Sequence, residues 1–230
     1  MSDFFRFPHT PHLAWLGEGT PRDDKVLSPP EANELLAGPV RVEEKLDGAN
    51  LGLSFAPDGS LRAQNRGEYL ARPYAGQFSR LGSWLGMHEW QWRGRLAANL
   101  ILFGEWCAAV HSLSYTELPD WFLLFDVYDR EAQRFWSARR RNALAEALGL
   151  SLVPLLREGK TDLRQLIKLV NDSRSRFRNG PLEGLVIRRD SVDWCESRAK
   201  LVRSEFTQAI DAHWRGRAID WNRVRAEGQS

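Results

Sequence analysis

The sequence predicts an α+β fold, because patterns typical of antiparallel strands and of capped helices occur in the same chain. Apolar and polar residues alternate on both sides of the turn signal Asp47-Gly48, which predicts a β-hairpin over 42–55. Two continuous apolar runs, 100–106 and 121–128, predict buried strands. Polar residues of the helix N-cap type stand directly before several helix-forming stretches.

The composition is that of an ordinary globular protein. The 230 residues are 43% apolar and 27% charged, which suits one domain over 1–230. There is no apolar run of about 18 residues and no signal-peptide hydrophobic region, so we expect a cytoplasmic protein without a membrane partner. A net charge of +2 is compatible with nucleic-acid binding without requiring it. Cys107 and Cys195 lie far apart, which argues against zinc or a disulfide.

The chain begins with an expected irregular wrap over 1–27, which is rich in aromatic residues and proline and lacks periodicity. His9 and His12 are three residues apart, but Pro11 interrupts any helix there and no other cysteine or histidine cluster supports a metal site.

The next elements surround a lysine. A capped helix is predicted over 28–37, before the expected hairpin. The turn at 57–60 predicts a third strand over 61–65, and Arg66 would then lie at a strand end beside Lys45.

Residues 76–99 carry apolar residues at near-helical spacing and predict one broken helix or two. Trp84, Trp90 and Trp92 are interpreted as core or interface residues, with base stacking as the alternative.

Two helices are predicted in the second half of the chain. Ser137 caps a helix over 138–148 that ends at Gly149, and Thr161 caps another through about residue 170.

The last elements are short. Strands are expected over 182–188 and 198–203, followed by a helix from 204 to about 219 within a C-terminal helix and tail, 204–230, whose end should fray. The basic stretch 173–178 encloses a phenylalanine and suits phosphate contacts and stacking, although such loops are often simply solvated.

Lys45 is the first candidate for chemistry. The chain has 27 arginines and only five lysines, so a lysine at this place is informative. Arginine stays protonated, whereas a lysine with a lowered pKa can act as a nucleophile. The alternative is an ordinary solvent-facing lysine on a hairpin. Glu105 and Asp126 end or interrupt apolar strands, where carboxylates are either catalytic or merely the first solvated group.

Six motifs follow one another in a known order. They are Lys45-Leu-Asp-Gly-Ala-Asn50, Arg66, Phe103-Gly-Glu-Trp106, Phe122-Leu-Leu-Phe-Asp126, Glu183-Gly-Leu-Val-Ile187 and Lys200. Over roughly residues 40–206 the chain therefore resembles the covalent nucleotidyltransferases, and most closely the RNA ligase 2-like ATP-dependent RNA ligases. The resemblance implies an ATP-grasp-like pair of antiparallel sheets around a nucleotide cleft.

The resemblance also implies roles and cofactors. It implies ATP and Mg²⁺ (or Mn²⁺) as cofactors, because making lysyl-AMP needs cations around the phosphates and a divalent metal on the leaving group. The residues assigned to catalysis are Lys45 as the nucleophile, Asp47 in the same motif, Glu183 as metal ligand and activator of the lysine, and Lys200 as a phosphate-binding cation. The residues assigned to cofactor binding are Glu44, Leu46 and Asn50 around the lysine, Arg66 on phosphate, Glu105 near ribose, Phe125 on adenine, and Asp126 as a weaker supporting candidate.

One position departs from the family pattern. The family often has a second lysine two residues after the position of Lys200, where this chain has Val202. Arg198 and Arg203 are the candidates to replace it.

The function implied is RNA ligation: self-adenylylation, AMP transfer to a 5′-phosphate end and joining to a 3′-hydroxyl. Asn50 favours RNA, because the DNA ligases of this superfamily usually carry arginine there. Only 30 residues follow Lys200, so we expect no OB-fold and no C-terminal RNA-binding domain, and an end-healing or RNA-binding partner protein is one way to recognise RNA ends during RNA repair. The alternatives are a minimal DNA ligase, a guanylyltransferase and a non-catalytic RNA-binding module.

Overall fold

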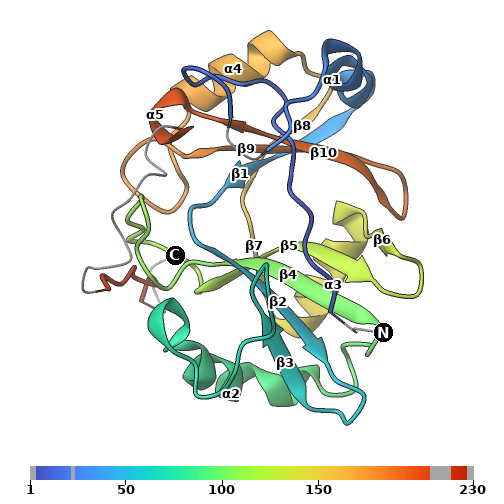
Figure 1. Cartoon of the computed structure of the whole chain (residues 1–230), viewed down its shortest axis with the longest axis vertical. Helices are drawn as coiled ribbons and strands as arrows, with labels where there is room; N and C mark the ends of the chain where they lie inside the picture. The colour runs from blue at the N-terminus through green and yellow to red at the C-terminus, as the bar shows by residue number, and fades with distance from the viewer. Residues whose placement is uncertain (1–3, 22–23, 208–218, 227–230) are drawn as a thin grey trace.

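The computed structural model describes residues 4–21, 24–207 and 219–226, and consists of two stacked β-sheets with helices on their outer sides (Figure 1). The upper sheet has the strand order β10-β9-β1-β8, and all neighbouring strands are antiparallel. Its strands are β1 (Val40–Lys45), β8 (Leu155–Gly159), β9 (Gly184–Asp190) and β10 (Cys195–Val202).

The lower sheet has the order β3-β2-β4-β5-β6, with β7 pairing in parallel to β5. Its strands are β2 (Ala49–Phe55), β3 (Leu61–Gln64), β4 (Leu100–Trp106), β5 (Phe122–Asp129), β6 (Arg134–Phe135) and β7 (Ser151–Leu152). The helices are α1 (Pro29–Leu36), the 3-10 helix η1 (Gly76–Phe78), α2 (Leu81–Trp92), α3 (Ala138–Leu148), α4 (Leu163–Asp172) and α5 (Ser204–Thr207). An α+β fold with antiparallel sheets is thereby confirmed.

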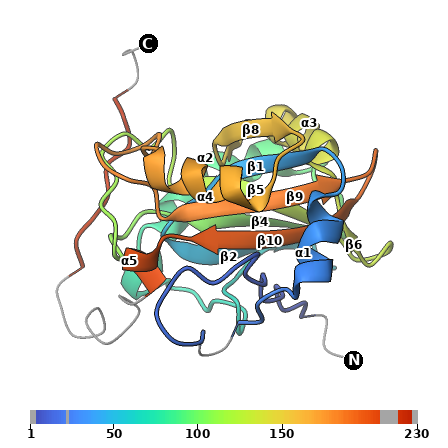
Figure 2. The ribbon, with the colours of Figure 1, turned by 90° about the horizontal axis from the view of Figure 1, so that it is seen from above.

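Each sheet buries one face against helices. Side chains of β1, β9 and β10 pack with those of α1 and α4. Figure 2, seen from above, shows both helices lying over this sheet. A larger core joins the lower sheet to α2 and α3 and includes Trp84 and Trp92. The inner faces, which are turned toward each other, also carry charged residues such as Lys45 and Arg188, and a cavity lies between them.

The predicted hairpin is wrong, although both of its strands exist. β1 pairs with β8 and β9, and β2 pairs with β3 and β4, so the chain crosses from one sheet to the other at 46–48. The backbone N–H groups of Asp47 and Gly48 bind the Tyr115 hydroxyl and the Glu105 carboxylate, so they are not available to close a two-residue turn. Alternation along a strand does not reveal which strand is its neighbour.

The helix predictions are largely confirmed. The caps of α1 at Ser28 and of α3 at Ser137 are as expected, and Gly149 ends α3 in the left-handed region at φ 66°. The cap of α4 is Asp162 rather than Thr161, because the Asp162 carboxylate accepts the Gln165 N–H. The predicted helix from residue 204 is present through Thr207, and its continuation over 208–218 lies outside the described residues.

Two expectations about exposure need correction. Trp90 is 70% exposed and so is not a core residue, whereas Trp84 and Trp92 are buried, and the interface role of Trp90 stays a prediction. The tail does not fray over 219–226: Asn222 is 4% exposed, because its side chain bonds with backbone groups of the loop after β4. Among the residues that the structure describes, no helix has the length and apolarity needed to cross a membrane.

Candidate active site

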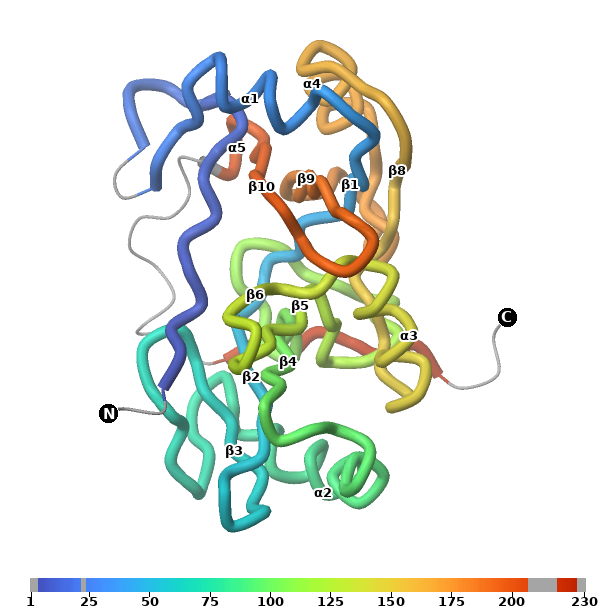
Figure 3. The backbone as a smooth tube through the Cα atoms, turned by 90° about the vertical axis from the view of Figure 1, so that its right-hand side faces the viewer, coloured from blue at the N-terminus to red at the C-terminus, as the bar shows by residue number. Residues whose placement is uncertain are grey.

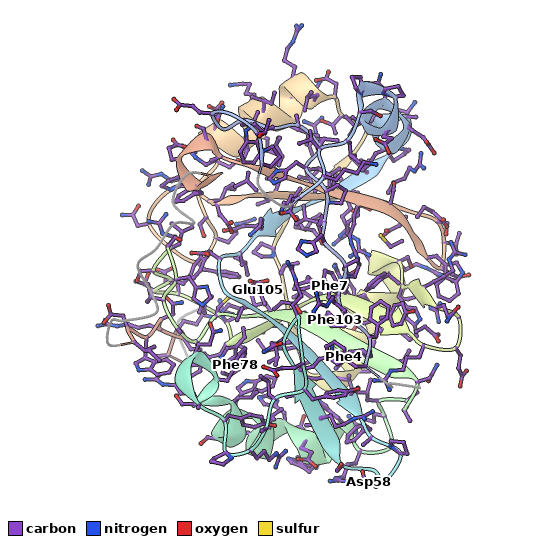
Figure 4. All side chains as sticks on the ribbon, in the orientation of Figure 1. Phe4, Phe7, Asp58, Phe78, Phe103 and Glu105 are labelled. Carbon is purple, nitrogen blue, oxygen red and sulfur yellow. The ribbon has the colours of Figure 1, made fainter. Side chains whose placement is uncertain are left out.

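A cavity of about 850 Å³ lies between the two sheets and is lined from both of them and from the N-terminal segment. Figure 4 shows Glu105, Phe7 and Phe78 facing this region. Nine of the eleven residues predicted from the sequence line it: Glu44, Lys45, Leu46, Asn50, Arg66, Glu105, Phe125, Asp126 and Lys200. The other two, Asp47 and Glu183, contact or support the lysine segment from beside the cavity.

Lys45 forms a hydrogen-bonded ion pair with Glu183. The antiparallel register places Lys45 opposite Gly184, which brings the preceding carboxylate to the lysine. Both oxygens of Glu183 lie 2.7 Å from the Lys45 Nζ. Burial by itself favours the neutral amine, but the negative charges of Glu183 and then Glu105 outweigh it, so the pKa of Lys45 is raised. These charges favour the protonated amine, and Glu183 is its nearest acceptor.

Asp47 holds the lysine segment in place. Its carboxylate accepts the backbone N–H groups of Ser112 and Leu113 at 2.6 and 2.7 Å, and its own N–H donates to the Tyr115 hydroxyl. This aspartate thus connects the crossing at 46–48 with the loop that follows β4.

The C-terminal segment steadies that loop. Asn222 donates to the carbonyls of Cys107 and Ala109 and accepts the Tyr115 N–H at 2.7 Å. Sequence reasoning missed Asn222, because its partners are backbone groups more than 100 residues away and no local pattern marks them.

Glu105 lies on β4 behind the lysine and accepts the Gly48 N–H at 3.0 Å. A Cβ at position 48 would stand 2.7 Å from the Trp106 carbonyl oxygen, so only glycine allows this close approach. Burial raises the pKa of Glu105 to about 7, with Glu183 and Asp47 adding to the effect and Lys45 opposing it. The cavity therefore holds a carboxyl group that titrates near neutral pH.

This raised pKa leads to a prediction for Glu105→Gln. Between pH 4.5 and about 7 the folded protein binds a proton at Glu105 that the unfolded chain has lost, so the free energy of unfolding falls as pH rises. Glutamine does not titrate. We measure the free energy of unfolding in urea at several pH values. From pH 4 to pH 8 this free energy should fall by about 1 to 3 kcal/mol more in wild type than in the variant. A stability difference that does not change with pH would contradict the assignment.

Cations from both sheets also line the cavity. Arg66 follows β3, as predicted, lines the cavity and is exposed, and it forms no ion pair within the described part of the chain. Asp126 is buried between the guanidinium groups of Arg188, at 2.6 Å, and Arg198. Since both of its oxygens bind arginines, Asp126 orients these cations.

Arg198 is the better replacement for the missing lysine. It lies on β10 two residues before Lys200 and lines the cavity, 4.0 Å from the ring centre of Phe135. Arg203 instead donates to the carbonyls of Val170 and Asn171 and pairs with Glu205 outside the cavity. Sequence reasoning had left the two open.

The N-terminal segment completes the site, which sequence reasoning did not anticipate. Figure 3 shows it running along one side of both sheets. The Pro11 carbonyl accepts the Lys200 backbone N–H, and the Leu13 N–H donates to the Lys200 carbonyl. Asp24 forms an ion pair with the Lys200 amine. Burial lowers the pKa of Lys200, although Asp24 opposes the shift. Within the described residues there is no group of three or more metal-binding side chains, at His9 and His12 or elsewhere.

The cavity also contains an acceptor without a donor. Asn50 Oδ1 is buried and has no hydrogen-bond partner among the described residues. The Glu44 side chain instead lies on the other face of β1, where its carboxylate accepts the Arg176 N–H. Phe125 stands half-buried at the cavity, with its ring 5.3 Å from that of Phe7. Since buried polar atoms are normally hydrogen-bonded, Asn50 Oδ1 marks a place for a donor group of a ligand.

Structural comparison finds relatives with the same fold. A Naegleria gruberi RNA ligase mutant with ATP and Mn has a TM-score of 0.64 and 19% identity over 90% of this chain. The same ligase with PPi gives 0.59 and 22% over 76% of this chain. This chain spans 58% and 52% of those two chains. No match was found among curated protein sequences.

The sequence comparison is more direct. The family model for RNA ligase matches residues 38–202, which is well over half of the chain and contains both sheets of the cavity. The chain therefore belongs to the RNA ligase family.

Proposed function

We propose that this protein is an ATP-dependent RNA ligase that forms a covalent lysyl-AMP at Lys45. The observation that carries the proposal is the place of the Lys45 amine: it faces a cavity large enough for a nucleotide, bonded to Glu183, with Arg66, Arg198 and Lys200 around the same space. The cavity and the order of the motifs support one domain over 1–230.

In the first step the Lys45 nitrogen attacks the α-phosphorus of ATP. A nitrogen–phosphorus bond forms, the bond from phosphorus to the bridging oxygen breaks, and pyrophosphate leaves. The amine must first lose a proton, and Glu183, 2.7 Å away, is the base that the site offers. The burial that raises the pKa of Glu183 to about 6 makes it a better proton acceptor than an exposed glutamate.

Two further transfers complete the reaction. An oxygen of the RNA 5′-phosphate attacks the adenylate phosphorus and releases Lys45. A 3′-hydroxyl then attacks the 5′-phosphorus, a phosphodiester bond forms and AMP leaves. The proposed substrate is RNA with 5′-phosphate and 3′-hydroxyl ends, as produced for RNA repair by an end-healing partner protein.

The residues present fit ATP. The adenine amino group and the ribose hydroxyls are donors, and Asn50 Oδ1 is a buried acceptor without a partner among the described residues. Phe125 offers a ring face to the base, and Arg66 and Lys200 offer positive charge to the phosphates. The Naegleria structure with ATP and Mn supports this reading.

The residues also fit a divalent metal that shares its ligands with ATP. Magnesium is usually held by one or two carboxylates and by substrate phosphates, so a protein cage of three ligands is not needed. Glu183 is the proposed protein ligand. When bound, the ion would neutralise phosphate charge and orient the pyrophosphate.

The test is incubation with each radiolabelled NTP and Mg²⁺ or Mn²⁺, followed by denaturing electrophoresis. We expect a labelled protein with ATP and little label with GTP. Preferred labelling by GTP would indicate a guanylyltransferase, and absence of label with every NTP would indicate a non-catalytic RNA-binding module.

A second measurement separates RNA ligase from minimal DNA ligase. Asn50 lines the cavity where DNA ligases of the superfamily carry arginine. We expect nicks whose 3′-hydroxyl strand ends in ribonucleotides to be sealed about fivefold faster than all-DNA nicks, since one hydrogen bond to a 2′-hydroxyl is worth about 1 kcal/mol. Equal rates in single-turnover sealing would favour the DNA ligase.

Phe125→Ala should raise the KM for ATP about 10-fold to 100-fold and leave the maximal adenylylation rate nearly unchanged. Stacking on adenine is worth about 1 to 3 kcal/mol and acts in the ground state as well as in the transition state. Phe125→Tyr keeps the ring and should behave like wild type. A defect of Phe125→Ala confined to the maximal rate would exclude the stacking role.

A further inference from the structure

The loop of residues 173–178, here called the arginine loop, presents positive charge beside the lysine segment. Arg174 and Arg176 are exposed and Arg178 is half-buried. None of the three forms an ion pair with any residue in the described ranges. Several other surface arginines are neutralised: Arg93 pairs with Glu89, Arg134 with Glu196, Arg139 with Asp193 and Arg189 with Glu34. The charge of the arginine loop is thus available to a partner.

The arginine loop is tied directly to the site. The Arg176 N–H donates to Glu44 Oε2 at 3.0 Å, one residue before Lys45, and the chain runs from this loop into Glu183. The Arg178 Nε donates to the Ser114 carbonyl at 3.3 Å, in the loop that binds Asp47. An occupant of this loop therefore lies next to the segments that hold the nucleophile.

The arginine loop is held in one shape. The Phe177 carbonyl accepts the N–H groups of Thr116 and Glu117, which joins the orange and green loops at the left of Figure 1. The Phe177 ring packs in a cluster with Leu46 and Tyr115, so it is not available for base stacking, contrary to one expectation from the sequence. The loop therefore offers its arginines, and not an aromatic ring, to a ligand.

Arg178 helps to hold the loop in this conformation. It lies over Gly180, where a Cβ would stand 2.5 Å from its Nη1, and donates to the Pro181 carbonyl at 2.6 Å. Arg174 makes one side-chain hydrogen bond, to Asn179, and Arg176 makes none within the described residues. Arg174 and Arg176 are thus the two guanidinium groups with donors to spare.

We propose that the arginine loop docks the phosphodiester backbone of the RNA strand that carries the 5′-phosphate, through Arg174 and Arg176. The inference rests on the proposed function, since a strand whose end reaches the adenylate on Lys45 must leave the cavity past the neighbouring loops. Guanidinium groups bind phosphate in a bidentate manner and without base preference. Binding therefore depends on salt and not on sequence.

The experiment compares Arg174→Ala/Arg176→Ala with Arg157→Ala/Arg164→Ala. The control removes the same charge from exposed positions on β8 and α4, away from the arginine loop. Protein already carrying radiolabelled AMP is mixed with single-stranded 5′-phosphate RNA at increasing concentration, and AMP transfer to the RNA is timed. RNA affinity is measured separately by fluorescence anisotropy at several salt concentrations.

We expect the loop variant to adenylylate itself at the wild-type rate but to need about 10-fold to 100-fold more RNA for half-maximal transfer. The slope of log affinity against log salt should be shallower by about 1.4, which is about 0.7 for each lost phosphate contact on a single strand. The control variant should follow wild type. RNA dependence and salt slope equal to those of the control would overturn the proposal.

The design keeps the two proposals apart. If wild-type protein forms no adenylate, the proposed function fails, and the anisotropy comparison still decides whether the arginine loop binds RNA. If wild type adenylylates and ligates while the loop variant binds RNA normally, only the docking proposal fails.

Discussion

Lys45→Arg should abolish the covalent protein–AMP adduct completely and leave the protein folded. Arginine keeps the positive charge and can donate to both oxygens of Glu183, so the ion pair between β1 and the start of β9 is conserved. Its guanidinium cannot be deprotonated in a protein and so cannot attack phosphorus. The measurement is labelling with radioactive ATP and Mg²⁺ on a denaturing gel, with thermal unfolding to verify the fold.

The chain provides a matched control for this variant. Lys168 on α4 is 78% exposed at its side chain and pairs with Asp172, so Lys168→Arg makes the same chemical change away from the cavity. Lys168→Arg should label like wild type. An adduct on Lys45→Arg protein would show that another residue is the nucleophile.

Glu183→Gln should slow lysine adenylylation about 100-fold or more at saturating ATP. Glutamine keeps the size of the side chain but lacks the charge that accepts a proton from Lys45 and that would bind a metal. Loss of one preorganised electrostatic group commonly costs about 100-fold to 1000-fold in rate. Because the ATP contacts proposed for Phe125 and Arg66 are untouched, raising ATP should not restore the rate.

The measurement is the single-turnover adenylylation rate against ATP and against Mg²⁺. Glu158→Gln is the control, since Glu158 is mostly exposed and pairs with Arg41 on the outer part of β1. If a higher ATP concentration alone restored the rate of Glu183→Gln, the role of Glu183 would be nucleotide binding and not the chemical step.

Local patterns in the sequence were sufficient for the elements. The strands β4 and β5, the helix α3 from Ser137 to Gly149, and the cap of α1 follow from apolar runs and capping residues, which act over a few neighbouring positions. The order of the motifs likewise identified nine residues that line one cavity, because the residue types that phosphate chemistry needs recur in a fixed sequence.

Only the tertiary structure decided how these elements meet. It separated β1 from β2, brought Glu183 to Lys45, set Asp24 against Lys200, and buried Asn222 under the loop that holds Asp47. Each of these contacts joins residues distant in the chain through backbone hydrogen bonds or buried charges. Their formation depends on which surfaces the whole chain removes from water. The sequence by itself determined the strands, the helices and the reactive residue types, but not which distant residues contact one another.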